Sequence, residues 1–380
     1  MAVPSKASTP ASRPPVSIQL YHQSSQYRNW RYSKEGLDQI RAELNVQAIE
    51  RVRNLWEEER AQQATASSAA ADTAPTSAAD TLAPPAETEY LTVSDELSLV
   101  TYYLTQASAM CGAFQFPEMV SATSISYLKR FYLRNTCMDY HPKNVMLTCV
   151  FLATKTENFP ISIDTFAGRV KTPPSDILSL EFLVSQSLSF EYKVHHAHLA
   201  LQGLLLDMQA ADVDLSALSA AAPKAHSYVR SSRLTSAEFL YTPAQISLAC
   251  FRLADSALAE KWLGVKEERL DEAIKKQEGK TGAGGSDAGS GDKAEQLQHD
   301  ALLRLLDEIQ EMVSDAQKNP VDKQSVVEVD KRLKLARNPE KDPNSALYKK
   351  RKAEEEAARE AKDRARAAKE PPNTDASVFD

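Results

Sequence analysis

The stretch from Val145 to Ala153 is almost wholly apolar, and on a helix its apolar side chains would point in every direction. A helix of this kind has no side for water and has to be wrapped by other helices. Pro142 stands just ahead of it and suits a first helical turn, because the N–H that proline lacks has no helical partner there. No alternating strand pattern competes along the chain, so the sequence predicts an all-α protein built around this helix.

Helical patterns on both sides of this stretch predict a bundle. Thr92 and Asp95 are three residues apart and resemble a capping box at the start of the first helix. Pro117 and Pro174, like Pro142, stand where further helices open. The predicted helices of this first bundle cover 93–111, 118–134, 143–156 and 174–188.

A short repeat indicates a second bundle of the same kind. Tyr140-His141-Pro142 recurs 101 residues later as Tyr241-Thr242-Pro243, and the apolar pattern that follows is repeated at the same offset. A repeat at a fixed period is typical of a duplicated structural unit. We therefore expect two tandem bundles of about five helices, each with a buried central helix, flanked by terminal helices.

Both ends of the chain are more polar than its middle. The segment 1–16 is rich in Ser, Pro and Ala and is expected to be disordered. An aromatic segment over 21–32, a polar helix over 33–63 and a flexible linker over 64–87 follow. The predicted divisions are an N-terminal region over 1–92, a first repeat over 93–192, a second repeat over 193–318 with a glycine-rich loop insert at 279–292, and a charged C-terminal helix or tail over 319–380.

Several classes of function are disfavoured by composition. The net charge of −7 argues against binding to a nucleic-acid backbone, which needs clustered cations. None of the four cysteines forms a CxxC pair, and His195, His196 and His198 do not converge at metal-ligand spacing. No apolar run is long enough to span a bilayer, and the first residues lack the apolar run typical of a secretory leader, so we expect the chain not to be secreted. We expect no cofactor, no metal, no membrane contact and no catalytic constellation.

Particular residues make the chain similar to the cyclins. Leu152-Ala153-Thr154-Lys155-Thr156-Glu157-Asn158 resembles the end of the third helix of a cyclin box, Leu-Ala-x-Lys-x-Glu-Glu. Within that family the chain most resembles the cyclin H type. The blocks that carry this resemblance are Tyr21 to Gln26 with Trp30, Lys129 to Leu133, Met138 to Pro142 with Met146 to Cys149, and Leu240 to Ile246.

The resemblance implies a cyclin fold and a regulatory role in the nucleus. A cyclin presses its first bundle on the small lobe of a protein kinase, which brings the αC Glu of the kinase to the Lys that holds ATP. The implied partners are the cyclin-dependent kinase of TFIIH, a RING-finger assembly factor and the TFIIH core. The implied targets are the RNA polymerase II repeat tail and, in many organisms, other cyclin-dependent kinases.

Kinase-contact residues follow from the same resemblance. Glu157 matches the first acid of the motif, and Asn158 stands where a second acid is usual. His141 stands where a Lys at the start of the helix is usual. Lys155 completes the set of polar contact residues. Phe159, Phe166 and Phe182 are candidates for the apolar part of the surface, although core packing is favoured for Phe182. Tyr21 and Trp30 are expected to lie outside the bundles as accessory N-terminal contacts.

Other interpretations remain open at this point. Another transcriptional cyclin, such as a cyclin C, shares the fold. A TFIIB-like core uses the same double bundle to bind DNA, but would need a basic face and usually a zinc ribbon. A helical scaffold without a kinase partner is a third possibility.

Overall fold

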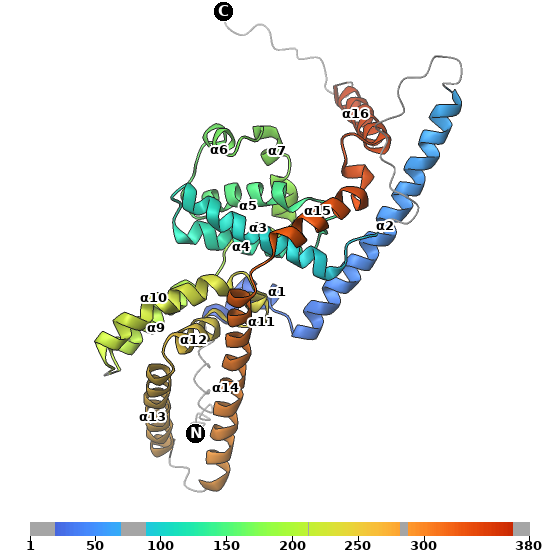
Figure 1. Ribbon diagram of the computed structural model, residues 1–380. Coiled ribbons are helices and arrows are strands. Elements are labelled where there is room, and N and C mark those ends of the chain that lie inside the picture. The colour runs from blue at the N-terminus through green and yellow to red at the C-terminus, as the bar shows by residue number, and fades with distance from the viewer. Residues whose placement is uncertain (1–19, 70–88, 212, 282–287, 368–380) are drawn as a thin grey trace, which may run out of the picture.

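The computed structural model describes residues 20–69, 89–211, 213–281 and 288–367. The described residues form helices and no strand, as predicted. Two helical bundles follow one another along the chain, and helices from both termini pack on the first of them (Figure 1). The disorder expected over 1–16 lies outside the described part.

The first bundle surrounds the helix that the apolar stretch predicted. This helix, α5, contacts α3, α4, α7 and α8, and Val145, Cys149 and Ala153 on it are fully buried. Thr92 and Asp95 form the predicted capping box at the start of α3. The helices of this bundle are α3 (Val93–Ala113), α4 (Glu118–Phe131), α5 (Pro142–Thr156), α6 (Ile163–Val170), α7 (Pro174–Leu178) and α8 (Glu181–Ser187).

The second bundle repeats this plan around α12. Thr242 caps α12 and Pro243 occupies its first turn, and the helix contacts α9, α10, α13 and α14. The two central helices thus open with the two repeated segments, which confirms the tandem arrangement. The helices of this bundle are α9 (Ala197–Gln209), α10 (Leu215–Ser232), α11 (Ala237–Leu240), α12 (Pro243–Ala254), α13 (Ser256–Thr281) and α14 (Ala288–Lys318).

Three sequence-based boundaries were wrong. The helix expected over 174–188 is broken between α7 and α8, where Ser179 and Leu180 form a turn. The glycine-rich insert is helical at both ends, because α13 continues to Thr281 and α14 begins at Ala288; the residues between them lie outside the described part. The linker begins later than expected, since the helix α2 (Lys34–Ala69) extends to Ala69. Extending an existing helix gains a hydrogen bond for each residue, which carries it through unfavourable residues.

The terminal helices complete the core of the first bundle. Val52 and Trp56 on α2 and Leu333 on α15 are buried in the same apolar cluster as α3, α4 and α5. Glu59 on α2 accepts a hydrogen bond from the backbone N–H of Leu347 at the start of α16, at 2.7 Å. The charged C-terminal region is therefore docked at its beginning, while α16 beyond its first turns is solvent-exposed. The terminal elements are η1 (Leu20–Gln23), α1 (Ser25–Asn29), α2 (Lys34–Ala69), α15 (Lys323–Ala336), η2 (Pro339–Lys341) and α16 (Ala346–Ala367).

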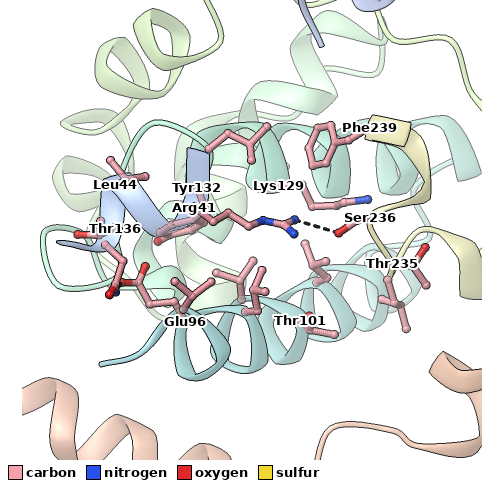
Figure 2. Close-up of a pocket in the computed structure, with 17 residues that line it drawn as sticks. Arg41, Leu44, Glu96, Thr101, Lys129, Tyr132, Thr136, Thr235, Ser236 and Phe239 are labelled. Carbon is pink, nitrogen blue, oxygen red and sulfur yellow. Dashed lines mark hydrogen bonds between the residues drawn. The ribbon is translucent and has the colours of Figure 1, made fainter. Parts of the chain in front are cut away.

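A small cavity of about 60 Å³ lies where α2, α3 and α4 meet the segment leading to α11. In Figure 2, Arg41 of α2 reaches across it and donates a hydrogen bond to Ser236 Oγ at 2.9 Å. Lys129 of α4 and Phe239 of α11 also line the cavity. The cavity marks the junction of the N-terminal helix with both bundles.

Candidate functional site

The C-terminal end of α5 presents a group of polar residues. Lys155 is exposed in the last turn, and Glu157 is the residue at which the helix ends. Asn158 follows with φ 56°, a left-handed conformation that Asn tolerates better than most residues and that stops the helix. Phe159 then leaves the helix with its ring exposed. Lys155, Glu157, Asn158 and Phe159 thus lie together at the end of α5.

An ion pair joins this end of α5 to α8. Lys155 Nζ pairs with Glu181 Oε1, and the ammonium also lies 4.4 Å from the centroid of the Phe151 ring. Glu181 was not singled out from the sequence, because a pairing between two separate helices has no local pattern. The pair is partly exposed, so its charges are available to a partner.

Exposed aromatic rings lie beside this ion pair. Phe182 is 70% exposed and Phe190 is 53% exposed, and their ring centroids are 6.1 Å apart. Phe159 is 45% exposed. Exposed large apolar side chains that lie together are typical of docking surfaces. We call this set the α5–α8 surface; it consists of Lys155, Glu157, Asn158, Phe159, Glu181, Phe182 and Phe190.

A groove of about 980 Å³ runs along the boundary between the two bundles and reaches Glu157. Tyr21 of the N-terminal segment, His196 and Leu199 of the second bundle line it as well. Glu157 Oε1 accepts a hydrogen bond from Thr123 Oγ1 on α4 at 2.6 Å. The acid is therefore held in place by its own chain while it borders a groove large enough for a peptide segment.

The two phenylalanine predictions were reversed. Phe166 is fully buried, with its ring centroid 5.3 Å from that of Phe114 and 5.6 Å from that of Phe151, so it cannot be a direct contact. Phe182, for which core packing was favoured, is among the most exposed apolar residues. The break between α7 and α8 explains the exposure of Phe182, because it turns α8 so that Phe182 faces solvent and Val184 faces the core.

His141 does not join the polar set at the end of α5. It caps the opposite end of this 15-residue helix, about 20 Å away, and its Nδ1 accepts from the Lys143 N–H. Its Nε2 lies 2.8 Å from Asp330 Oδ1 on α15. His141 therefore helps dock the C-terminal helix.

Trp30 lies at the junction of the bundles rather than outside them. It is buried with Leu133 and Phe239, and its Nε1 donates to Glu191 Oε2 at 2.6 Å. The guanidinium groups of Arg130 and Arg134 lie over its ring at 4.8 and 5.0 Å. Tyr21 is half-buried, and burial raises its pKa. Of the two N-terminal candidates, only Tyr21 reaches the groove.

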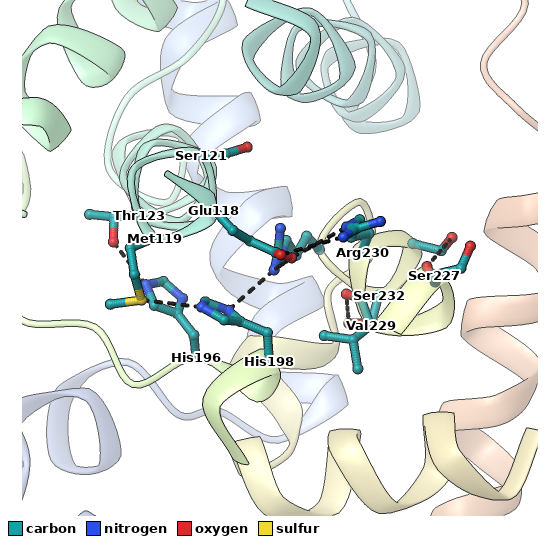
Figure 3. Close-up of polar contacts among 12 residues, drawn as sticks. Glu118, Met119, Ser121, Thr123, His196, His198, Ser227, Val229, Arg230 and Ser232 are labelled. Carbon is teal, nitrogen blue, oxygen red and sulfur yellow. Dashed lines mark hydrogen bonds and ion pairs between the residues drawn. The ribbon is translucent and has the colours of Figure 1, made fainter. Parts of the chain in front are cut away.

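Two of the three histidines near the start of α9 stack on each other. Figure 3 shows His196 and His198 side by side, with ring centroids 5.2 Å apart. Within the part of the chain that is described, no three His, Cys, Asp or Glu side chains could hold a metal ion together. Among the described helices, none is long and apolar enough to cross a membrane.

Comparisons with known proteins match both bundles. A cyclin N-terminal domain model matches residues 90–193, and a cyclin C-terminal domain model matches residues 196–314. Cyclin CCL1 of Saccharomyces cerevisiae is 33% identical over 251 residues, which cover 65% of this chain and 61% of the relative. A putative cyclin-H of Dictyostelium discoideum is 34% identical over 188 residues, covering 50% of this chain and 56% of the relative. The chain thus spans less than two thirds of the length of these relatives.

Solved structures resemble the whole fold. A chain of the CAK complex of Chaetomium thermophilum bound to ATP-gamma-S matches with a TM-score of 0.67 and 25% identity, over 95% of this chain and 98% of that one. A chain of the yeast TFIIK (Kin28/Ccl1/Tfb3) complex matches with a TM-score of 0.53 and 26% identity, over 77% of this chain and 100% of that one. Each bundle has a buried central helix, and each is matched by a cyclin domain model. This chain therefore belongs to the cyclin family, and within it to the cyclin H type.

Proposed function

We propose that this chain is the regulatory cyclin of a TFIIH-type kinase, which it binds and activates without doing chemistry itself. The observation that carries this proposal is the likeness to a chain of the CAK complex, which extends over both bundles and the terminal helices. Similarity to Cyclin CCL1 and to a chain of the TFIIK complex supports the same kinase class. A cyclin C or TFIIB-like function has no comparable support.

The α5–α8 surface is the proposed kinase contact. Its exposed rings, Phe159, Phe182 and Phe190, offer apolar area to the small lobe, while Glu157 and the Lys155–Glu181 pair offer charges to polar groups at a helix end. Aromatic side chains surrounded by charge are typical of the residues that dominate binding energy. Holding the kinase αC helix inward from this surface would bring its Glu to the Lys that binds the ATP phosphates.

The wider assignments belong to the same proposal. The activated kinase phosphorylates the RNA polymerase II repeat tail and other cyclin-dependent kinases, in a nuclear assembly with a RING-finger factor and the TFIIH core. The basic run Lys349 to Lys352 lies on the exposed side of α16, where an import receptor could bind it.

Kinase activity on a polymerase-tail peptide tests the proposal. The TFIIH kinase subunit of the same organism is assayed alone, with this chain and with its Glu157→Ala variant. We expect strong activation by the intact chain and weaker activation by the variant. Glu311→Ala, which removes an exposed carboxylate from α14, is the matched control and should activate like the intact chain.

The outcomes separate the parts of the proposal. Activation that is unchanged by Glu157→Ala would keep the cyclin role and remove Glu157 from the contact. A chain that neither binds nor activates the kinase would overturn the proposed function.

A further inference from the structure

The carboxylate of Glu157 is held by a chain of hydrogen bonds that starts in the second bundle. Thr123 on α4 is fully buried between the bundles. Its Oγ1 lies 2.6 Å from Glu157 Oε1 and 2.8 Å from His196 Nε2. His196 is the residue immediately before α9, the first helix of the second bundle. One hydroxyl thus connects the proposed kinase-contact acid to the start of the second repeat.

The chemistry of the three groups fixes the direction of these bonds. A carboxylate can only accept, so the single O–H of Thr123 is donated to Glu157. The hydroxyl oxygen then accepts from His196, whose Nε2 must carry the ring proton. Burial, together with the nearby His198, lowers the pKa of His196 well below its usual value, so the ring is neutral with one N–H. That N–H is used on Thr123.

His196 is itself held by its neighbours, as Figure 3 shows. Its ring stacks on that of His198, with an interplanar angle of 24°. His198 Nδ1 accepts from Arg233 Nη2 at 3.2 Å, and its Nε2 lies 3.1 Å from Met119 Sδ. Arg233 in turn donates to Glu118 Oε1 at 2.7 Å. The ring of His196 therefore has one orientation, fixed by residues of both bundles.

We propose that Thr123 and His196 are positioning residues for kinase binding, which set the orientation of the Glu157 carboxylate from the second bundle. This inference rests on the proposed function. The described residues give Glu157 Oε1 its hydrogen bond from Thr123 and give Oε2 none. With one oxygen fixed, the other meets a donor on the kinase without first losing rotational freedom.

Thr123 offers a test in which shape and hydrogen bonding are separated. Thr123→Val keeps the size of the side chain and removes the hydroxyl, whereas Thr123→Ser keeps the hydroxyl. Dissociation constants for the kinase subunit are measured by calorimetry with the full chain. We expect the Val variant to bind about three- to tenfold more weakly, the range of one hydrogen bond, and the Ser variant to bind within about twofold of the original chain.

A second pair of variants tests the histidine. His196→Gln supplies an N–H donor, whereas His196→Leu supplies none; neither removes a helix cap, because the side chain of His196 makes no capping hydrogen bond. The Leu variant should weaken binding less than Thr123→Val does, because Thr123 keeps its hydrogen bond to Glu157, and the Gln variant should restore most of the affinity.

A double-mutant cycle distinguishes positioning from a general structural role. Each substitution is repeated in the Glu157→Ala background, where a positioning residue has nothing left to orient. We expect Thr123→Val to have no further effect there. An equal loss of affinity in both backgrounds would overturn the positioning role and leave the function intact. Unchanged affinity of Glu157→Ala itself would overturn both the contact and its positioning, and absence of kinase binding by the unaltered chain would overturn the proposed function.

Discussion

Lys129 Nζ, on α4 of the first bundle, lies 3.4 Å from Glu238 Oε1 on α11, and both groups are largely buried at the junction of the two bundles. Lys129 also donates to the Arg233 carbonyl at 3.2 Å, and Glu238 Oε2 accepts from Ser126 Oγ at 2.7 Å. Burial lowers the pKa of Lys129, an effect that the charge of Glu238 opposes. The bundles are therefore joined by a charge pair in which each partner depends on the other.

Removing the cation from this pair should destabilise the fold strongly. Lys129→Met removes the ion-pair partner of the buried Glu238 carboxylate and leaves it the more distant charges of Arg130 and Arg233, a loss that typically costs about 3 kcal/mol. The unfolding free energy in urea measures the loss. Lys334→Met breaks an exposed pair with Asp330 on α15, and as a control it should cost less than about 0.5 kcal/mol. Equal losses for the two variants would contradict a structural role for the Lys129–Glu238 pair.

Glu96 should make stability depend on pH near neutrality. Burial raises the pKa of this carboxyl to about 7 from 4.5, against the opposing hydrogen bonds from Cys137 N and Asn45. Between these two values the folded state holds the proton more tightly than the unfolded chain does. The contribution of Glu96 to stability is therefore complete below pH 4.5 and is lost as the pH rises through 7, by about 2–3 kcal/mol.

Glu96→Gln removes this titration and keeps an acceptor. The difference in unfolding free energy between the original chain and the variant, measured from pH 4.5 to 8, isolates the residue from other titrating groups. We expect the original chain to lose stability relative to the variant across this range. Parallel curves would show that Glu96 ionises alike in both states.

The docking of α15 should depend on one face of that helix. Leu333 is 2% exposed within the first core, whereas Leu335, two residues away, is 37% exposed. Leu333→Ala leaves a cavity and should lower the unfolding free energy by about 2–4 kcal/mol. Leu335→Ala changes the same atoms on the outer face and should cost less than about 1 kcal/mol. Similar losses would mean that α15 does not pack as described.

Local signals in the sequence were sufficient to predict where α3, α5 and α12 begin and that the bundle is duplicated. Thr92 with Asp95 and Thr242 with Pro243 are capping patterns whose partners lie within a few residues. They therefore predict where a helix begins without any knowledge of the fold. The apolar stretch of α5 likewise carries its own evidence of burial. These features depend on short-range geometry alone.

Properties that depend on distant residues were not predictable in the same way. Phe166 and Phe182 are chemically alike, but Phe166 on α6 packs against Phe114 and Phe151, whereas the break between α7 and α8 leaves Phe182 exposed. Glu181 joins the surface through its ion pair with Lys155, which lies on a different helix. The docked face of α15 did leave a signal: Val326, Val329, Leu333 and Ala336 follow a helical spacing, but the charged residues between them made the segment look like a solvated tail.

The exchange between Phe166 and Phe182 leads to the most direct test of the α5–α8 surface. Phe182→Ser removes a ring that is 70% exposed, so the unfolding free energy should change by less than about 0.5 kcal/mol. Kinase affinity should nevertheless fall about tenfold or more, because an exposed aromatic at the centre of an interface contributes strongly to the binding free energy.

Phe166→Ala should behave in the opposite way. It empties a core position, lowers the unfolding free energy by about 3–5 kcal/mol, and weakens binding only as far as it unfolds the chain. Leu206→Ser, at an equally exposed apolar site on α9 of the second bundle, controls for loss of surface apolar area and should leave kinase affinity unchanged. If Phe182→Ser and Leu206→Ser bind the kinase alike, the kinase contact lies outside the α5–α8 surface.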